Sequence, residues 1–287
     1  LRRAEARRSA AGETAVPATD LPLEETVEPV NPPEGNETID VVIPPAADVL
    51  LPGDFEYLGA FRLPGGEDPP LTFAYGGNAM TFNPDGDPDD GGDGFPGTLF
   101  ITGHDRVAYG GVPDGDQVAE VGIPAPVIAD NIEGLNTGEF IQDFTNVTAG
   151  HFTELEEIPK VGLTYLNRPE TGLKIHITWG QHLQPQDIAS HAWFNANLSD
   201  PDFTGTSFIG HQDLYSTTGY MFEIPSEWAD MVTGGRYLAT GRMRDGGQGG
   251  MGPTMFACRS WQADGSPYPN GARLQEVTLL LYENAYN

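Results

Sequence analysis

The chain has 287 residues, of which 42 are acidic and only 14 are basic, so its formal net charge at pH 7 is −28. This balance argues against nucleic acid as a partner, because phosphate binding needs clustered lysine and arginine. The single cysteine, Cys258, excludes an internal disulfide bond, and no apolar run approaches the roughly 18 residues that a membrane-spanning helix needs. An acidic surface of this kind suits solubility, a salty environment or divalent cations.

The first 52 residues lack the pattern of a folded domain. Residues 1–16 include four arginines among alanine and glutamate, which predicts a short basic helix or a frayed terminus. Residues 17–52 are rich in proline, glutamate and threonine and have no amphipathic period, which predicts an extended arm. We expect this arm to dock on a neighbouring subunit, and Ile39–Ile43 is its one segment suited to pairing with a sheet edge.

Residues 53–287 alternate apolar and polar side chains between turns, which predicts a β domain. Phe55–Leu63 is an isolated expected strand, and Val277–Tyr282 opens a fourth group after three groups of three. The three groups are Asn78–Phe82, Thr98–Gly103 and Gln117–Ile123; Gly162–Leu166, Lys174–Trp179 and His191–Leu198; and Gly219–Ile224, Arg236–Thr240 and Pro253–Cys258. A helix is expected only at Ser226–Val232, where Ser226 is suited to be the N-cap.

The fold class that these groups predict is all-β. Three- to four-stranded antiparallel units that recur along a chain are typical of a β-propeller. The units are too divergent to be WD40 or kelch repeats, and a β-sandwich with long insertions is the alternative. The expected organisation is therefore a propeller-like β domain preceded by the proline-rich arm.

Several segments of the sequence resemble segments found in an uncharacterised group of secreted, propeller-like bacterial proteins. They are FEYLGAFRLP, FAYGGNAMTFNP, LFITGHDR, QVAEVGIP, GYMFEIP, GGRYLATGRMRDGGQGGMGP and LLLYEN, and they span Phe55 to Tyr282. The resemblance implies a fold and a location outside the cell, and it brings no assigned activity and no catalytic residues. It also implies further repeats, so that the β domain would be a truncated copy. Alternatively, Phe55–Leu63 pairs with Val277–Tyr282 and closes a small ring.

An aspartate-rich loop between the first two expected strands is the sharpest chemical signal. Asp85, Asp87 and Asp89 alternate, and Asp93 follows four residues later. Alternating carboxylates on a glycine-rich loop can direct hard oxygen ligands at one centre, as calcium requires. Pro88 within the loop and the lack of a glutamate at the bidentate position depart from an EF-hand. The loop predicts a calcium site, and a solvated acidic hairpin is the alternative.

Four of the six histidines lie in one stretch of the sequence: His176, His182, His191 and His211. Such a set at the rim of a propeller would suit a metal-dependent lyase or hydrolase, although its spacing matches no compact metal motif. Strand histidines more often form structural hydrogen bonds, and this is the preferred interpretation.

Other candidates for sugar chemistry are weaker. With so many acidic residues no carboxylate pair is informative, and the best guess is Asp105 with Glu120. Arg242 and Arg244 open a glycine-rich loop and could hold a sugar acid, although an ion pair within the protein is the preferred reading. The four tryptophans could stack on sugars, but core packing is expected for at least two of them. Cys258 lies in an apolar strand and is expected to be a core residue.

Two functional hypotheses follow. The first is a non-enzymatic extracellular or cell-surface structural protein, a homo-oligomer of fibre or surface-layer type, with a calcium-stabilised β domain whose arm docks on neighbouring subunits. The second is a secreted propeller that binds carbohydrate or acts on it as a lyase or hydrolase. The sequence contains no P-loop, no Rossmann fingerprint and no G-x-S-x-G nucleophile elbow.

Overall fold

The computed structural model describes residues 50–66, 71–74, 79–88, 94–103, 116–154, 160–180, 189–210, 217, 219–241 and 253–281. Internal contacts divide the chain into two units, residues 1–47 and residues 48–287, and everything described below belongs to the second unit. The expected terminal helix and nearly all of the expected arm therefore lie outside the described residues.

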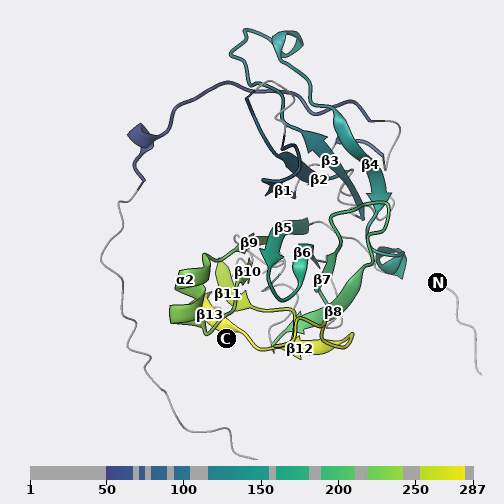
Figure 1. The fold of residues 1–287 in the computed structure, drawn as a ribbon, viewed down its shortest axis with the longest axis vertical. Helices are drawn as coiled ribbons and strands as arrows, with labels where there is room; N and C mark the ends of the chain where they lie inside the picture. The colour runs from purple at the N-terminus through teal and green to yellow at the C-terminus, as the bar shows by residue number, and fades with distance from the viewer. Residues whose placement is uncertain are drawn as a thin grey trace, which may run out of the picture. The chain divides into compact units, whose positions relative to one another are not determined.

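The described residues form three β-sheets, and none of these sheets closes into a barrel (Figure 1). The first sheet is an antiparallel meander of β1 (Met80–Asn83), β2 (Thr98–Thr102), β3 (Gln117–Gly122) and β4 (Phe140–Asn146). The second contains β5 (Lys160–Arg168), β6 (Gly172–Gly180), β7 (His191–Phe194) and β8 (Thr204–Ile209), with β12 (Ala272–Leu274) parallel to β8. The third has the order β9 (Tyr220–Glu223), β10 (Leu238–Gly241), β11 (Thr254–Cys258) and β13 (Val277–Leu281).

The longest pairing is the β5–β6 hairpin, which runs from Lys160 opposite Gly180 to Arg168 opposite Gly172. Three residues close this hairpin, and Gly172 follows them with a φ of +65°. A glycine adopts this left-handed conformation without the steric penalty of a Cβ atom, which suits a three-residue hairpin loop.

Helical structure is short throughout the described residues. Three 3₁₀ turns are η1 (Pro52–Asp54), η3 (Ile132–Gly134) and η4 (His151–Glu154). The helix expected after β9 is present as α2 (Ser226–Trp228), followed by a π-helical turn, η5 (Ala229–Thr233), that ends at Gly234 with a φ of +62°. Ser226 is not its N-cap, because Pro225 occupies that position, and the Ser226 hydroxyl accepts a hydrogen bond from Arg168 instead.

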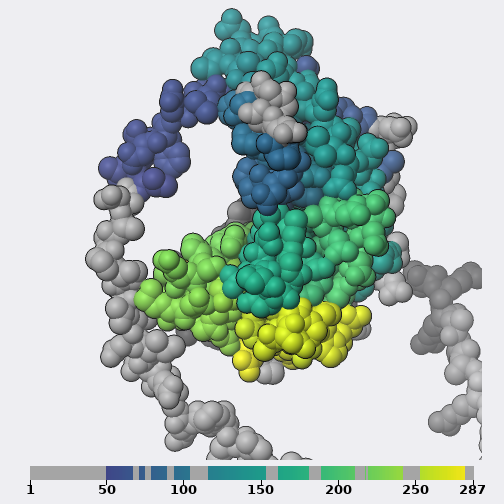
Figure 2. All heavy atoms as spheres, in the orientation of Figure 1, coloured from purple at the N-terminus to yellow at the C-terminus, as the bar shows by residue number. Residues whose placement is uncertain are grey.

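Two apolar clusters hold the three sheets together. One lies between the first and second sheets and includes Phe100, Ile177 and Trp179. The other lies between the second and third sheets and includes Trp193 and Phe256. In Figure 2, β5 to β8 of the second sheet (teal to green) accordingly lie between the first sheet (blue to teal) and the third (yellow-green to yellow).

The expected grouping of strands is confirmed in part. All nine strands of the three expected groups are present, but the first and third sheets each have a fourth strand and the second has a fourth and a fifth; β4, β8 and β12 had not been expected. The expectation that Val277–Tyr282 opens a fourth group is wrong, since β13 pairs with β11 as the last strand of the third sheet. The small-ring alternative is also not seen: Ala60 and Arg62 bridge to Val127 and Thr137, between β3 and β4.

Among the described residues, no helix has the length and apolar character needed to cross a membrane. The β-rich class predicted from the sequence is confirmed.

Candidate functional site

The first strands of the three sheets meet around one pocket. β5 packs against both β1 and β9, and residues of all three strands line a cavity of about 430 Å³. β5 and β9 can approach each other closely because Gly162 of β5 has no side chain. A Cβ atom at Gly162 would lie 2.9 Å from the backbone of Met221 in β9. The lining residues are Met80, Thr81, Phe82, Pro84, Leu163, Thr164, Tyr165, Met221, Phe222 and Glu223. We call this cavity the central pocket.

Large apolar side chains on the walls of the central pocket remain in contact with solvent. Met80 is 61% exposed, Phe82 48% and Phe222 43%. Single exposed apolar residues are common on protein surfaces, but a group of them around one cavity marks a surface suited to an apolar partner.

Tyr165 connects this pocket with the aspartate-rich loop. Its backbone N–H donates to Thr81 Oγ1 at 2.7 Å, and its hydroxyl donates to Asp85 Oδ2 at 3.1 Å. Burial, reinforced by the bond to Asp85, raises the pKa of Tyr165 above its usual value, so the phenol stays protonated as a donor. Thr164, also on the wall, is buried, and its hydroxyl has no hydrogen-bond partner in the part of the chain that the structure describes.

The expected calcium ligands are only partly visible. Asp85 and Asp87 are described, whereas Asp89 and Asp93 lie outside the described residues. Asp85 accepts the Tyr165 hydroxyl, and its own N–H donates to Asn83 Oδ1 at 3.1 Å, so one of its oxygens already has a partner. No group of three potential metal ligands occurs among the described residues. The calcium site stays a prediction.

Glu120 is part of a buried hydrogen-bond network rather than an exposed carboxylate pair. It is 4% exposed and accepts from the Thr98 hydroxyl, from Asn83 Nδ2 at 3.1 Å and from Gln142 Nε2 at 2.6 Å. Gln142 continues the network to the backbone carbonyl of Ala196, in the connection between β7 and β8, at 2.9 Å. These bonds hold the start of the acidic loop to β3 and β4. Asp105, the other half of the guessed pair, lies outside the described residues.

His176 and His191 lie between the second and third sheets. His191 bonds through Nδ1 to Ser190 Oγ at 2.7 Å and through Nε2 to Thr240 Oγ1 at 2.9 Å. His176 Nδ1 bonds to Ser260 Oγ at 3.1 Å. Complete burial lowers the pKa of both imidazoles to about 3, so both are neutral near pH 7.

These two histidines join sheets and do not line the central pocket. His182, His211, Arg242 and Arg244 lie outside the described residues, so the rest of the proposed sugar site is untested. The expectation of core tryptophans is confirmed, since Trp179, Trp193 and Trp261 are buried. Burial also raises the pKa of Cys258 to about 12, in agreement with its expected place in the core.

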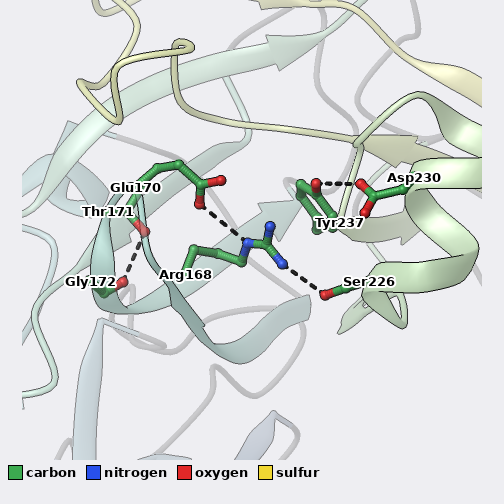
Figure 3. A network of polar contacts seen from close by, with 7 residues as sticks. All are labelled: Arg168, Glu170, Thr171, Gly172, Ser226, Asp230 and Tyr237. Carbon is green, nitrogen blue, oxygen red and sulfur yellow. Dashed lines mark hydrogen bonds and ion pairs between the residues drawn. The ribbon is translucent and has the colours of Figure 1, made fainter.

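Figure 3 shows a polar network, not anticipated from the sequence, at the end of β5. The Arg168 guanidinium lies 3.7 Å from the ring centroid of Tyr237, donates to Ser226 Oγ at 2.7 Å and pairs with Glu170 at 3.4 Å. The Tyr237 hydroxyl donates to Asp230 Oδ1 at 2.6 Å, and this bond raises the pKa of Tyr237. The network fastens the β5–β6 turn to the third sheet, which is a structural role.

The central pocket is therefore the candidate site: its walls mix apolar and polar side chains, it is open, and the described start of the acidic loop borders it. Comparison with known proteins found no matching family model, no similar curated protein and no similar solved structure.

Proposed function

We propose that this protein is a non-enzymatic, extracellular assembly component whose β domain is an arc of propeller blades. Each sheet is built mainly from consecutive antiparallel strands, and the first strand of each borders the central pocket. Radial sheets whose first strands surround a common axis are the arrangement of a propeller. The location outside the cell rests on the sequence resemblance alone.

The observation that carries the assembly role is the exposed apolar rim formed by Met80, Phe82 and Phe222. The first and third sheets each pack against the second, and no comparable contact joins the first to the third among the described residues. Their apolar inner strands are thus available to another β-sheet. We assign that position to a second copy of this chain.

The geometry of such a contact favours open or ring-shaped assemblies. A contact between the first sheet of one copy and the third sheet of another is heterologous when the reciprocal contact does not form in the same pair. Repeated heterologous contacts produce rings when the rotation closes and filaments when it does not. This matches a fibre or surface-layer component, with the acidic arm as a further contact between subunits.

Two further features support a structural role. Three described residues that the sequence nominated for catalysis, Glu120, His176 and His191, are buried and serve in hydrogen bonds between strands and sheets. The acidic loop is tied to the central pocket through the bond from Tyr165 to Asp85. Calcium bound by Asp85, Asp87, Asp89 and Asp93 would therefore stiffen the rim at which copies meet.

The test is the mass of the full chain in solution by light scattering, over a range of concentrations, with calcium and with EDTA. We expect assemblies that become smaller in EDTA. Phe82→Glu and Phe222→Glu should shift the protein to monomers, whereas the control Met231→Glu, at a side chain 54% exposed and away from the pocket, should not.

A monomer at every concentration would refute the assembly role, as would equal effects of all three substitutions. A calcium-insensitive monomer would favour the carbohydrate-binding alternative, and screening of the protein against glycans would follow.

A further inference from the structure

A smaller pocket, separate from the central pocket, lies at the end of the third sheet where β10 begins and β11 ends. It has a volume of about 170 Å³ and is lined by Gly234, Arg236, Arg259, Tyr268 and Gln275. Arg236 precedes β10 and Arg259 follows β11, and the antiparallel pairing of Leu238 with Cys258 brings both to the same end of the sheet. Two arginines in one small cavity are unusual in a chain with only 14 basic residues.

The guanidinium of Arg236 is held in a fixed orientation. It donates from Nη1 to the Thr233 carbonyl at 2.7 Å, from Nε to the Gln275 carbonyl at 3.1 Å and from Nη2 to Gln275 Oε1 at 3.2 Å. A guanidinium has five N–H donors, and these three bonds leave two of them. The fork is therefore positioned before any ligand arrives, and it keeps donors for one.

Arg259 donates to no partner in the part of the chain that the structure describes. Its side chain is half-buried, and it makes no hydrogen bond or ion pair with any of the described residues. The carboxylate of Glu276, beside Gln275 in the sequence, lies against Gly210 and does not line the pocket. A half-buried guanidinium without an anion is costly, and a bound anion would offset that cost.

We propose that this pocket binds the carboxylate group of a small molecule. The planar fork of arginine matches the two oxygens of a carboxylate, and two forks can hold them from different directions. The net charge of −28 disfavours a dianion such as phosphate more than a monoanion. The volume limits the ligand to about the size of one monosaccharide acid or one amino acid, and Tyr268 and Gln275 add polar groups for the rest of it.

The test is calorimetric titration of the full chain with D-glucuronate, N-acetyl-L-alanine, acetate and inorganic phosphate, of which the first three each carry one carboxylate. We expect the carboxylates to bind more tightly than phosphate, and the tighter of the first two ligands identifies a sugar acid or an amino acid as the source. Arg259→Gln should weaken binding by about ten- to hundredfold, the effect expected when hydrogen bonds to a charged group are lost.

The matched control is Arg273→Gln, because Arg273 bonds to the Gly210 carbonyl and stacks on Phe208 outside the pocket. Circular dichroism would confirm that both variants are folded, and removal of Arg259 breaks no described bond. Equal binding by Arg259→Gln and the wild type, absence of binding by every carboxylate, or tighter binding of phosphate would each overturn the proposal. None of these results depends on the assembly state.

Discussion

The two buried histidines predict a specific loss of stability on acidification. His176 and His191 have a pKa of about 3 in the folded protein, against 6.5 for an ordinary imidazole. Between these values the unfolded chain binds more protons than the folded chain, so the free energy of unfolding falls as the pH falls. The contribution of the neutral imidazoles to the free energy of unfolding is complete above about pH 6.5 and is progressively lost below that pH.

The size of the expected loss in the free energy of unfolding follows from how far the pH lies below the pKa of the imidazole in the unfolded chain. At about pH 5 each imidazole lies about 1.5 pH units below its unfolded pKa, and one unit corresponds to about 1.4 kcal/mol. Each histidine should therefore contribute a loss of about 2 kcal/mol between about pH 7.5 and about pH 5, and the pair about 4 kcal/mol. That is a large share of the stability of an ordinary domain.

The assay is urea unfolding of the wild type and of His191→Gln at these two pH values. The pH dependence that all other titratable groups contribute is common to both proteins and cancels in the comparison. We expect the wild type to lose about 2 kcal/mol more than the variant, because glutamine has no proton to gain. Equal losses would refute the reasoning, as would an NMR titration in which His191 protonates near its ordinary pKa in the folded state.

Three other predictions concern the networks around the sheets. Arg168→Lys keeps the charge but loses the planar contact with Tyr237, and should lower the free energy of unfolding by about 1–2 kcal/mol, as measured by urea unfolding; an unchanged value would contradict the role of this network. Glu120→Gln replaces an acceptor by an amide that faces the Gln142 donor, and should cost about 1–3 kcal/mol in the same assay, with no effect if the buried carboxylate is dispensable. Calcium at about a hundredfold above its dissociation constant should stabilise the wild type by about 2.7 kcal/mol, seen as a higher melting temperature, and Asp87→Asn should reduce this gain; a melting temperature insensitive to calcium would leave the loop a solvated hairpin.

Most strands could be predicted from the sequence because their apolar residues cluster between turns. The exceptions had weaker local patterns. β4 contains Gln142 and Asp143 and is half-buried along most of its length, and β8 contains Gly205, a residue type that is depleted in strands. β13 was recognised as a strand, but its partner could not be inferred, since pairing with β11 depends on which sheet edge is free.

The site was less predictable than the fold for the same reason. His176 and His191 stood out as chemically capable side chains, yet their hydrogen-bond partners Ser260 and Thr240 are far away in the sequence. The pairing of Arg236 with Arg259 around one pocket likewise arises only when β10 and β11 align. Sequence patterns report which residues share a strand, whereas the partners of a side chain depend on how strands and sheets pack.

The parallel pairing of β12 with β8 has a consequence for synthesis on the ribosome. The second sheet obtains its last strand only when Leu274 is available to pair with Ile209, and 274 − 209 = 65 residues separate these partners in the chain. At about 5–20 residues per second, the outer edge of β8 would lack this strand for roughly 3 to 13 seconds. An unpaired sheet edge is a template for other strands. For these seconds a nascent chain on one ribosome could pair with a chain on its neighbour, so crowding of ribosomes on a message would affect the yield of folded protein.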